Sequence, residues 1–397
     1  MKEAHIFLVL RNKIIGIDSV ITLCMQIHKE CNCNFTFILF DHGSFEAIKD
    51  DNVVLFDAIN KIGKLVSLSD QSYGYGVISK IYKLFFLIRM IVKINYGKSY
   101  IMHSGGLHKN PLKFIVNFLP FKKIIFHERS PYNKPPPNNF YNTEIFFNRH
   151  HTEELFNKMK KLFSLPVLNA GVLIGYDKQW NYFKHINAKH THNLVFEDSR
   201  NAGAWLNFIE KKSINYINEE LDLNNLSHHK NKKIITVFIG RIHLDKSGKF
   251  IESFIQMMNG LAKSVGNKVP IFIKAHIFSD IEFVERCISK GIKGYNLDYI
   301  LTKLHPSVLS RKAAMSLFIS TGTVAYEISN LNIPIIQCLN GFNDEEIPEM
   351  SSKMSSYIFT KKTEDMATVI NKLLGTDHNP VVYKKVQGKM LDCSFLN

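Results

Sequence analysis

The stretch 234-IITVFIGRIHLDKSG-248 decides the fold class of this chain. Residues 234–239 are apolar or β-branched without interruption, which predicts a buried β-strand. Gly240 then begins a polar turn, and the apolar spacing over 247–262 predicts an amphipathic helix. A buried strand that leads through a glycine turn into a helix is the repeating unit of a parallel α/β sheet.

The same alternation of short apolar runs and helical patterns continues through the whole chain. In the second half we expect strands at 270–273, 316–319 and 334–336, and helices at 280–289, 323–331 and 364–374. In the first half we expect strands at 5–10, 34–40, 53–56, 99–103, 123–127 and 167–169, and helices at 19–30, 77–94, 111–118 and 152–163. The fold class predicted is α/β, with two Rossmann-like domains that face a cleft.

Chain length and one polar segment place the expected domain boundary. With 397 residues, of which 45% are hydrophobic and 21% charged, the chain is long enough for two globular domains, and a disordered protein is excluded. The segment 221-LDLNNLSHHKNKK-233 has few large apolar residues and precedes an abrupt strand pattern. We therefore expect domains at 1–220 and 221–397.

Charge and cysteine usage limit the partners and the compartment. The formal net charge is +15, which favours anionic partners such as nucleotide phosphates, nucleic acid or an acidic lipid surface. The six cysteines form no C-x-x-C pair, so we expect neither a zinc ribbon nor a disulfide framework, and a reducing cytoplasm fits best. The apolar start is too short for a signal peptide, and cations interrupt the longest apolar region, so we expect no transmembrane segment.

The turn after the strand 234–239 carries the chemistry of an anion site. Arg241 offers a planar fork for phosphate oxygens, and Lys246 adds a point charge beside the expected helix N-terminus. The dipole of that helix also favours an anion at this end. The residues therefore predict a diphosphate site, for which the alternative is a surface turn with two solvated cations.

At this point the sequence resembles a known family. GRIHLDKSG (240–248) is similar to the G-R-x-x-x-x-K-G stretch of nucleotide-sugar-dependent glycosyltransferases with the GT-B architecture. STGTVAYEISNLNIPII (320–336) is similar to that family's small-residue turn, helix with an internal glutamate and proline-led strand. The resemblance implies that Arg241 and Lys246 hold the donor diphosphate and that Glu327 binds the donor ribose. It also implies phosphate contacts at the start of the helix, from Ser320, Thr321, Gly322 and Thr323, for which simple N-capping is the alternative.

A second resemblance, one departure from the family pattern and the absence of one metal-binding motif add to this interpretation. FIKAH (272–276) looks like the strand-end K-x-H of capsule-polysaccharide and polysialic-acid-type transferases, which implies two more phosphate donors, Lys274 and His276. Ile319 stands where many retaining members carry a second glutamate, so inverting and retaining chemistry both stay open. The sequence contains no D-x-D triplet, so we expect no metal and no other cofactor.

Three further expectations concern the catalytic base that activates the acceptor, the residues that recognise the nucleobase of the donor, and the remaining histidines. Asp18, His103 and Glu128 follow predicted strands, and we favour Glu128 or His103 as the catalytic base that takes the acceptor proton. The loop 293–298, with Tyr295 as a stacking residue, is the guess for donor-base recognition. The histidine pairs, among them His228-His229, lack the spacing of a metal motif and are interpreted as solvated or incidental.

The expected helix 77–94 lies in a basic region, because residues 71–127 contain nine Lys or Arg and no Asp or Glu. A helical wheel predicts an apolar face that packs on the sheet, made of Val77, Ile81, Leu84, Phe85, Ile88, Ile91 and Val92. The other face would carry cations with interleaved aromatics and Met90, namely Lys80, Lys83, Arg89, Lys93, Tyr82 and Phe86. Such a face is typical of helices on anionic membranes, and a crossover helix with snorkelling lysines is the alternative.

Together these features predict a cytoplasmic, peripheral-membrane glycosyltransferase of bacterial O-antigen or capsule assembly. It would move a sugar from a nucleotide-sugar donor to a lipid-linked glycan acceptor at an anionic membrane surface, with no nucleic-acid partner. A nucleotide-sugar epimerase of the same fold is one alternative, and donor turnover without an acceptor would favour it. A non-enzymatic polyanion-binding protein is the other, and steeply salt-dependent binding to unrelated nucleic acid would favour it.

Overall fold

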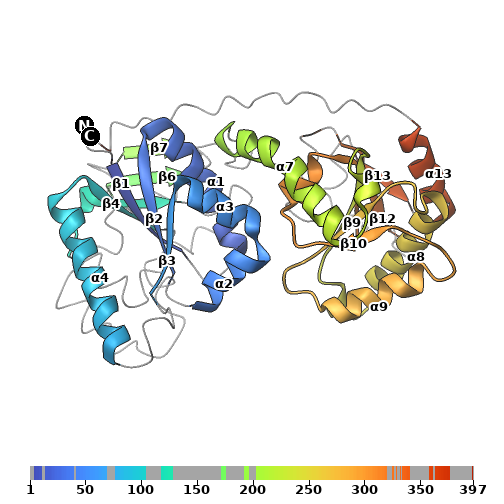
Figure 1. Ribbon diagram of the computed structural model, residues 1–397, viewed down its shortest axis with the longest axis horizontal. Helices are drawn as coiled ribbons and strands as arrows, with labels where there is room; N and C mark the ends of the chain where they lie inside the picture. Colours follow the sequence, from blue (N-terminus) through green and yellow to red (C-terminus); the bar gives the residue numbers. More distant parts are fainter. Residues whose placement is uncertain are drawn as a thin grey trace, which may run out of the picture. The chain divides into compact units, whose positions relative to one another are not determined.

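A computed structural model describes residues 4–10, 14–39, 42–68, 77–103, 118–127, 171–175, 192–195, 203–319, 324–325, 328, 331, 333–339, 357–360, 363–375 and 396. The chain divides into two compact units, Met1–Leu206 with Lys385–Asn397, and Asn207–Lys384. Each unit is built on its own parallel sheet with helices against it (Figure 1). The α/β class with two Rossmann-like domains is therefore confirmed.

The first unit holds a seven-stranded sheet in the order β3-β2-β1-β4-β5-β6-β7. All its strand pairs are parallel. The strands are β1 (Ala4–Val9), β2 (Cys33–Leu39), β3 (Gly63–Ser67), β4 (Ser99–His103), β5 (Ile124–His127), β6 (Val172–Gly175) and β7 (His192–Val195). The helices are α1 (Ile14–Cys31), α2 (His42–Asp51), α3 (Val53–Ile62), α4 (Val77–Tyr96) and the single turn η2 (Phe121–Lys123). The strand order changes direction between β1 and β4, which is the switch point where open α/β sheets bind ligands.

The second unit holds a six-stranded parallel sheet in the order β10-β9-β8-β11-β12-β13. Its strands are β8 (Ile234–Ile239), β9 (Ile271–Ala275), β10 (Tyr299–Leu301), β11 (Ala313–Phe318), β12 (Ile335–Cys338) and β13 (Tyr357–Thr360). Helix α7 (Gly203–Leu223) begins in the last residues of the first unit and continues into the second. The other helices of the second unit are η7 (Ser227–His229), η8 (Ile242–Leu244), α8 (Lys249–Ser264), α9 (Ile281–Gly291), α10 (Pro306–Ser310) and α13 (Thr363–Leu374). The switch point here lies between β8 and β11, so the loop after β8 begins at the expected ligand edge.

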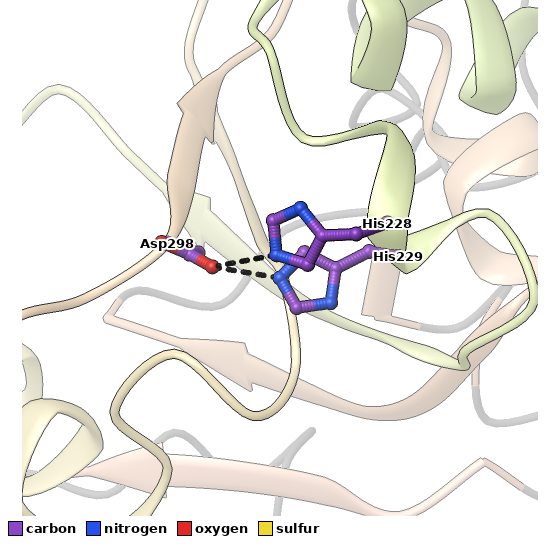
Figure 2. A group of neighbouring side chains, drawn as sticks. All are labelled: His228, His229 and Asp298. Atoms are coloured by element: carbon purple, nitrogen blue, oxygen red, sulfur yellow. Dashed lines mark hydrogen bonds and ion pairs between the residues drawn. The ribbon is translucent and has the colours of Figure 1, made fainter.

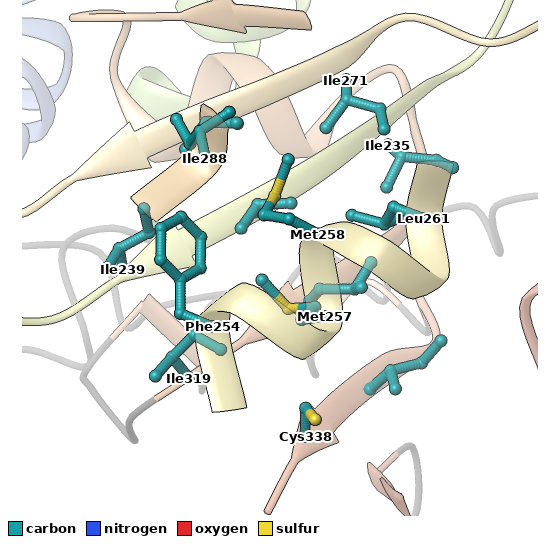
Figure 3. Close-up of a cluster of buried hydrophobic side chains, with 14 of the residues drawn as sticks. Ile235, Ile239, Phe254, Met257, Met258, Leu261, Ile271, Ile288, Ile319 and Cys338 are labelled. Carbon is teal, nitrogen blue, oxygen red and sulfur yellow. The ribbon is translucent and has the colours of Figure 1, made fainter. Parts of the chain in front are cut away.

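The core of the second unit lies between one face of this sheet and helices α8, α9 and α13. Phe254, Met257 and Leu261 of α8 are fully buried and project toward strand residues such as Ile235 and Ile271 (Figure 3). Helices α8 and α9 approach closely at one point, because a Cβ on Gly291 would lie 2.6 Å from Met258 Cβ. The opposite face of the sheet is also packed, with the Phe238 and Phe318 rings stacked at 5.0 Å. Strand β8 is therefore covered on both faces and held rigidly under the loop that follows it.

Helix α4 packs on the first sheet mainly through residues outside the predicted apolar face, of which Ile91 alone among the described residues contacts the core. Met90 and Ile94 are buried in the core cluster, and Phe86, Leu87 and Ile91 pack partly against it. The residues predicted to face the sheet are largely exposed, namely Ile81, Leu84, Phe85, Ile88 and Val92. The helical wheel therefore predicted the wrong face of α4 to be buried. Helix α4 has apolar residues on more than one side, so the wheel contains two apolar stripes and does not decide which of them packs on the sheet.

Several other local predictions need correction. Val53–Phe56 was expected to be a strand, but it begins α3, whose Val54, Leu55 and Ala58 are buried at helical spacing. Asp18 was expected to follow the first strand, but it lies inside α1. Strand 167–169 and helix 152–163 lie outside the described residues, as does nearly all of the expected helix 111–118.

Two further observations concern the oxidation state of the cysteines and the length and apolar character of the helices. Cys31 is disulfide-bonded, which the sequence analysis did not anticipate, whereas Cys24, Cys33, Cys287 and Cys338 are free and buried. Within the described part of the chain, no helix combines the length and the apolar character that crossing a bilayer requires.

Candidate functional site

The loop after β8 is organised by one carboxylate. Asp245 Oδ1 accepts hydrogen bonds from the Ser247 backbone N–H at 3.0 Å and the Ser247 hydroxyl at 2.6 Å. Its Oδ2 accepts a 2.7 Å hydrogen bond from the backbone N–H of Phe250, in the first turn of α8. Burial raises the pKa of the Asp245 carboxyl, but these hydrogen bonds outweigh it and leave that pKa below its usual value. Asp245 thus ties the loop to the start of α8.

This arrangement changes the expected role of the α8 N-terminus. The α8 helix begins after Gly248, whose φ of +74° lies in the left-handed region that favours glycine. The Lys249 N–H donates to the Ser247 hydroxyl at 3.3 Å, and the next N–H groups bond to Asp245. A carboxylate from this chain therefore already occupies the position where the helix dipole favours an anion. A ligand phosphate at this place would therefore be bound by side chains and not by the first backbone N–H groups of α8.

Arg241, His243 and His276 form a group of basic side chains at the carboxyl ends of β8 and β9. Arg241 is separated from the end of β8 only by Gly240 and is exposed, with its guanidinium 5.4 Å from the ring centre of Phe278. The pKa of His276 is lowered by burial, and further by the charge of Arg241 and by His243. The His276 backbone N–H donates to Ile239 O at 2.9 Å, so the ends of β8 and β9 are joined at this point. Of these three residues, sequence analysis missed only His243, two positions after Arg241.

Lys246 and Lys274, the other predicted phosphate donors, differ from each other in their surroundings. Lys246 is exposed on the loop between Asp245 and Ser247. The Lys274 ammonium donates to Lys303 O at 2.7 Å and interacts with the carboxylate of Glu220 on α7. Burial raises the pKa of Glu220, although its hydrogen bond with Thr302 and the charge of Lys274 oppose that rise. Lys274 therefore contributes to a second polar group that the sequence pattern did not reveal.

Several predicted site residues lie outside the described residues, namely Ser320, Thr321, Gly322, Thr323, Glu327 and Glu128. The described residues beside them show where the chain enters these segments. Ile319 is fully buried at the end of β11, and Val324 and Ala325 are helical. Strand β11, which ends at Phe318, pairs with β8, so the last described residues before position 320 lie at the same edge of the sheet as Arg241.

In the first unit, His103 and His127 end the neighbouring strands β4 and β5 and are both buried. Burial, together with the smaller effect of the neighbouring His127, lowers the pKa of His103 to about 3. The His103 ring also meets Phe126 edge-on, with centroids 5.5 Å apart. At neutral pH His103 is therefore a neutral, weakly basic imidazole, which is poorly matched to the proton-accepting role predicted for it.

The loop 293–298 lies at the opposite edge of the second sheet from Arg241 and His276, the predicted phosphate-binding residues. It leads into β10, and Asp298 O accepts a hydrogen bond from Ile271 N at the start of β9. This loop therefore lies at the amino edge of the sheet, whereas Arg241 and His276 lie at the carboxyl edge. The guess that Tyr295 stacks on the donor base is thus not supported by its position.

Comparison with known proteins supports the fold. No protein-family model and no curated protein matches this sequence. UDP-GlcNAc 2-epimerase from Methanocaldococcus jannaschii is similar in structure, with a TM-score of 0.50, 11% identity and coverage of 95% of this chain and 94% of its own. A glycosyltransferase from Rickettsia africae gives a TM-score of 0.46 at 12% identity, covering 95% and 90%. The two Rossmann-like units and the first of these likenesses place the chain in the GT-B fold class.

Proposed function

We propose that this protein is a GT-B glycosyltransferase that takes its sugar from a nucleotide-sugar donor bound by the second unit. The observation that carries the proposal is the group of Arg241, His243 and His276 at the switch-point edge, where burial lowers the pKa of His276 and the two basic neighbours lower it further. Groups that repel one another in the free protein are stabilised when an anion binds between them. A nucleoside diphosphate is the anion that this fold class commonly holds at that edge.

The proposed chemistry is stabilisation of the departing diphosphate. As the glycosidic bond to the donor breaks, negative charge develops on the leaving phosphate oxygens, and fixed cations lower the barrier. Arg241 supplies a planar fork, Lys246 an exposed ammonium and His276 a group that gains a proton as the anion arrives. Glu327 for the ribose, and Lys274 with Ser320, Thr321, Gly322 and Thr323 for the phosphates, complete the proposed donor site. No step in this scheme requires a metal.

The test is a thermal-shift screen of nucleoside diphosphates on the wild type, Arg241→Ala and Arg286→Ala. Arg286 is the matched control, because it is an exposed arginine on α9 of the same unit. A ligand at 100 times its Kd stabilises by about 2.7 kcal/mol, which corresponds to a shift of a few degrees. We expect one nucleoside diphosphate to shift the wild type and Arg286→Ala but not Arg241→Ala. The absence of any nucleotide shift would overturn the proposal.

The products of donor turnover separate transfer from epimerisation. The M. jannaschii structure of similar fold is called a UDP-GlcNAc 2-epimerase, so the epimerase alternative deserves a direct assay. An epimerase converts the donor without an acceptor, whereas a transferase releases nucleoside diphosphate in proportion to glycan formed. Binding of arbitrary polyanions with a steep salt dependence, and no nucleotide selectivity, would instead support a polyanion-binding protein.

For the acceptor proton, Glu128 is the better of the two predicted bases. The low pKa of His103 leaves it little tendency to take a proton at neutral pH. In the sequence, Glu128 immediately follows His127, the last residue of β5. We expect Glu128→Gln to lose transfer while donor binding persists, and His103→Gln to keep measurable transfer.

We propose further that the outer face of α4 docks on an anionic membrane, where a lipid-linked glycan acceptor would reside. This outer face consists of Ile81, Leu84, Phe85, Ile88 and Val92, each more than two-fifths exposed. Exposed cations accompany it at Lys80, Arg89 and Lys93, and α4 contains no acidic residue. Apolar side chains with cations beside them suit the boundary between acyl chains and acidic headgroups. This would place the enzyme on the cytoplasmic side of the membrane, in O-antigen or capsule assembly.

Vesicle sedimentation tests this docking. We compare neutral phosphatidylcholine vesicles with vesicles that contain phosphatidylglycerol, using the wild type, Phe85→Ser and Leu223→Ser. Leu223 is the control because it is 81% exposed on a different helix. The wild type and Leu223→Ser should bind the acidic vesicles, and Phe85→Ser should bind them several-fold less. Equal binding by all three proteins would contradict the assignment to α4.

A further inference from the structure

A second group of chemically reactive side chains lies at the other edge of the second sheet. His228 and His229 lie in η7, just before β8, and Asp298 directly precedes β10. Because the strand order is β10-β9-β8, these segments flank the start of β9. His229 and Asp298 are 69 positions apart in the sequence, and the fold brings them together. Sequence analysis interpreted His228-His229 as solvated or incidental, which is wrong for His229, since that side chain is fully buried.

The three side chains converge on one point (Figure 2). His229 Nε2 lies 2.7 Å from Asp298 Oδ2, and His228 Nε2 lies 3.5 Å from the same oxygen. The potential ligand atoms all lie within 4.8 Å of one another. Neighbouring residues of a 3₁₀ turn ordinarily point about 120° apart, yet these two rings have centroids only 4.0 Å apart. Both imidazoles are therefore turned toward a single shared position.

We propose that His228, His229 and Asp298 bind one divalent transition-metal ion, of which zinc is the best fit. Two imidazole nitrogens and a carboxylate oxygen form a ligand set that zinc accepts, with tetrahedral ligand atoms about 3.3 Å apart. Within the described part of the chain, the ion pairs of Asp298 involve these two histidines and no lysine or arginine. A divalent ion would therefore meet a carboxylate that no stronger cation has neutralised.

The exposure of the three ligands indicates how an ion would enter and what it would do. The His229 side chain is 0% exposed and fixes one ligand rigidly, while His228 at 58% and Asp298 at 23% leave the site open to solvent. Water from this open side would complete the coordination. Strand β8 has six residues, so this edge is about 20 Å from the group of Arg241 and His276. The ion would act as a clip between the starts of β8 and β10, separate from sugar transfer.

The experiment uses the full chain, stripped with EDTA and dialysed. Zinc chloride is titrated against the wild type, His228→Ala, Asp298→Asn and two controls, by calorimetry and by competition with a chromogenic chelator. The controls are His28→Ala, a histidine of the first unit, and Asp365→Asn, an exposed acid on α13. The exposed position of His228 means that His228→Ala should fold normally, which circular dichroism verifies.

We expect one zinc ion per wild-type chain and per control chain, with at least tenfold weaker binding in His228→Ala and Asp298→Asn. Zinc should raise the Tm of the wild type by a few degrees, and EDTA should reverse the rise. Cobalt in place of zinc should give visible absorption of a four-coordinate site. No stoichiometric binding to the wild type, or unchanged binding in both variants, would overturn the proposal. The nucleotide shift should persist in EDTA, so the metal proposal and the proposed function can fail separately.

Discussion

Helices α8 and α4 both cover the sheet of their own unit, but α8 has one apolar stripe and buries it, whereas α4 buries few of the residues that were predicted to face the sheet. Both helices follow a strand and cover a parallel sheet. In α8 the apolar stripe that includes Phe254 and Leu261 is buried, and Glu252 is exposed. In α4 the buried residues include Met90, which the wheel had placed among the cations, while Phe85 from the predicted core face is 69% exposed.

The difference has a physical origin in how many apolar stripes each helix carries. Helix α8 alternates apolar residues with Lys249, Glu252, Gln256 and Lys263, so only one stripe is able to face the core. Helix α4 has apolar residues all round, interrupted by cations whose long stems let the charge reach water from several positions. Periodicity therefore decides the orientation of a helix only when its polar face is continuous.

The largest expected effect is the loss of stability when a buried aromatic side chain of α8 is removed, compared with removal of an exposed one of α4. Phe254→Ala should lower the free energy of unfolding of the second unit by about 3–5 kcal/mol, because it leaves a cavity in a fully buried site. Phe85→Ala should change the stability of the first unit by no more than about 0.5 kcal/mol, because that ring is mostly exposed. Urea denaturation followed by hydrogen exchange in each unit measures both changes. Equal losses in the two variants would refute the orientation of α4.

A neighbouring pair within α4 sharpens the same point. Met90→Ala should destabilise the first unit by about 2–5 kcal/mol, because Met90 is 1% exposed within the core cluster. Ile88→Ala should cost far less, since Ile88 is 48% exposed. The wheel prediction gives the opposite ranking, so one urea series on these two variants decides between the faces.

The sequence predicted an element correctly where the residue pattern of a segment fitted only one type of secondary structure. The run 234–239 is apolar or β-branched throughout and is β8 with the bounds predicted. The helix predicted at 280–289 is α9, and Asp280 caps it by accepting from the Phe283 N–H at 3.0 Å. Val53–Phe56 was misread because four apolar residues in a row fit a strand and a buried helix equally well. The pattern continues as DAINKI at helical spacing, which is the signal that distinguishes the two.

The candidate site was predictable in part. Arg241 and His276 follow strands, and parallel strands bring their carboxyl ends to one edge, so their proximity followed from the pattern. The role of Asp245 was not anticipated, although an aspartate two positions before Ser247 is a known turn signal. The contact between His229 and Asp298 could not be predicted from the sequence. The two residues are 69 positions apart, and they come together only because β8 and β10 are both neighbours of β9 in the sheet.

Acid should distinguish the unit that carries α4 from the unit that carries α8. The pKa of His103 is about 3 in the folded first unit and about 6.5 in an unfolded chain. Between these values the unfolded chain binds the additional proton, so stability is full above pH 6.5 and falls as the pH decreases. The loss from this group is up to about 1.4 kcal/mol per pH unit.

His103→Gln should reduce this acid sensitivity of the first unit, whereas His28→Gln, a substitution on α1, should leave it in place. Urea denaturation of both variants between pH 7 and pH 5, with hydrogen exchange to assign the unit, provides the measurement. A wild-type first unit whose stability is independent of pH over this range would show that His103 is not held in its neutral form.

The starts of the helices provide the smallest expected effect. Helix α8 begins with Asp245 bonded to the Phe250 N–H and with Gly248 at a positive φ. Asp245→Ala removes this cap and should lower the stability of the second unit by about 1 kcal/mol, while Asp245→Asn keeps an oxygen acceptor and should lose less. Because the carboxylate also occupies the anion position of the helix, Asp245→Ala should not weaken nucleoside-diphosphate binding as strongly as Arg241→Ala. If Asp245→Ala abolished nucleotide binding without loss of stability, the carboxylate would belong to the ligand site rather than to the helix cap.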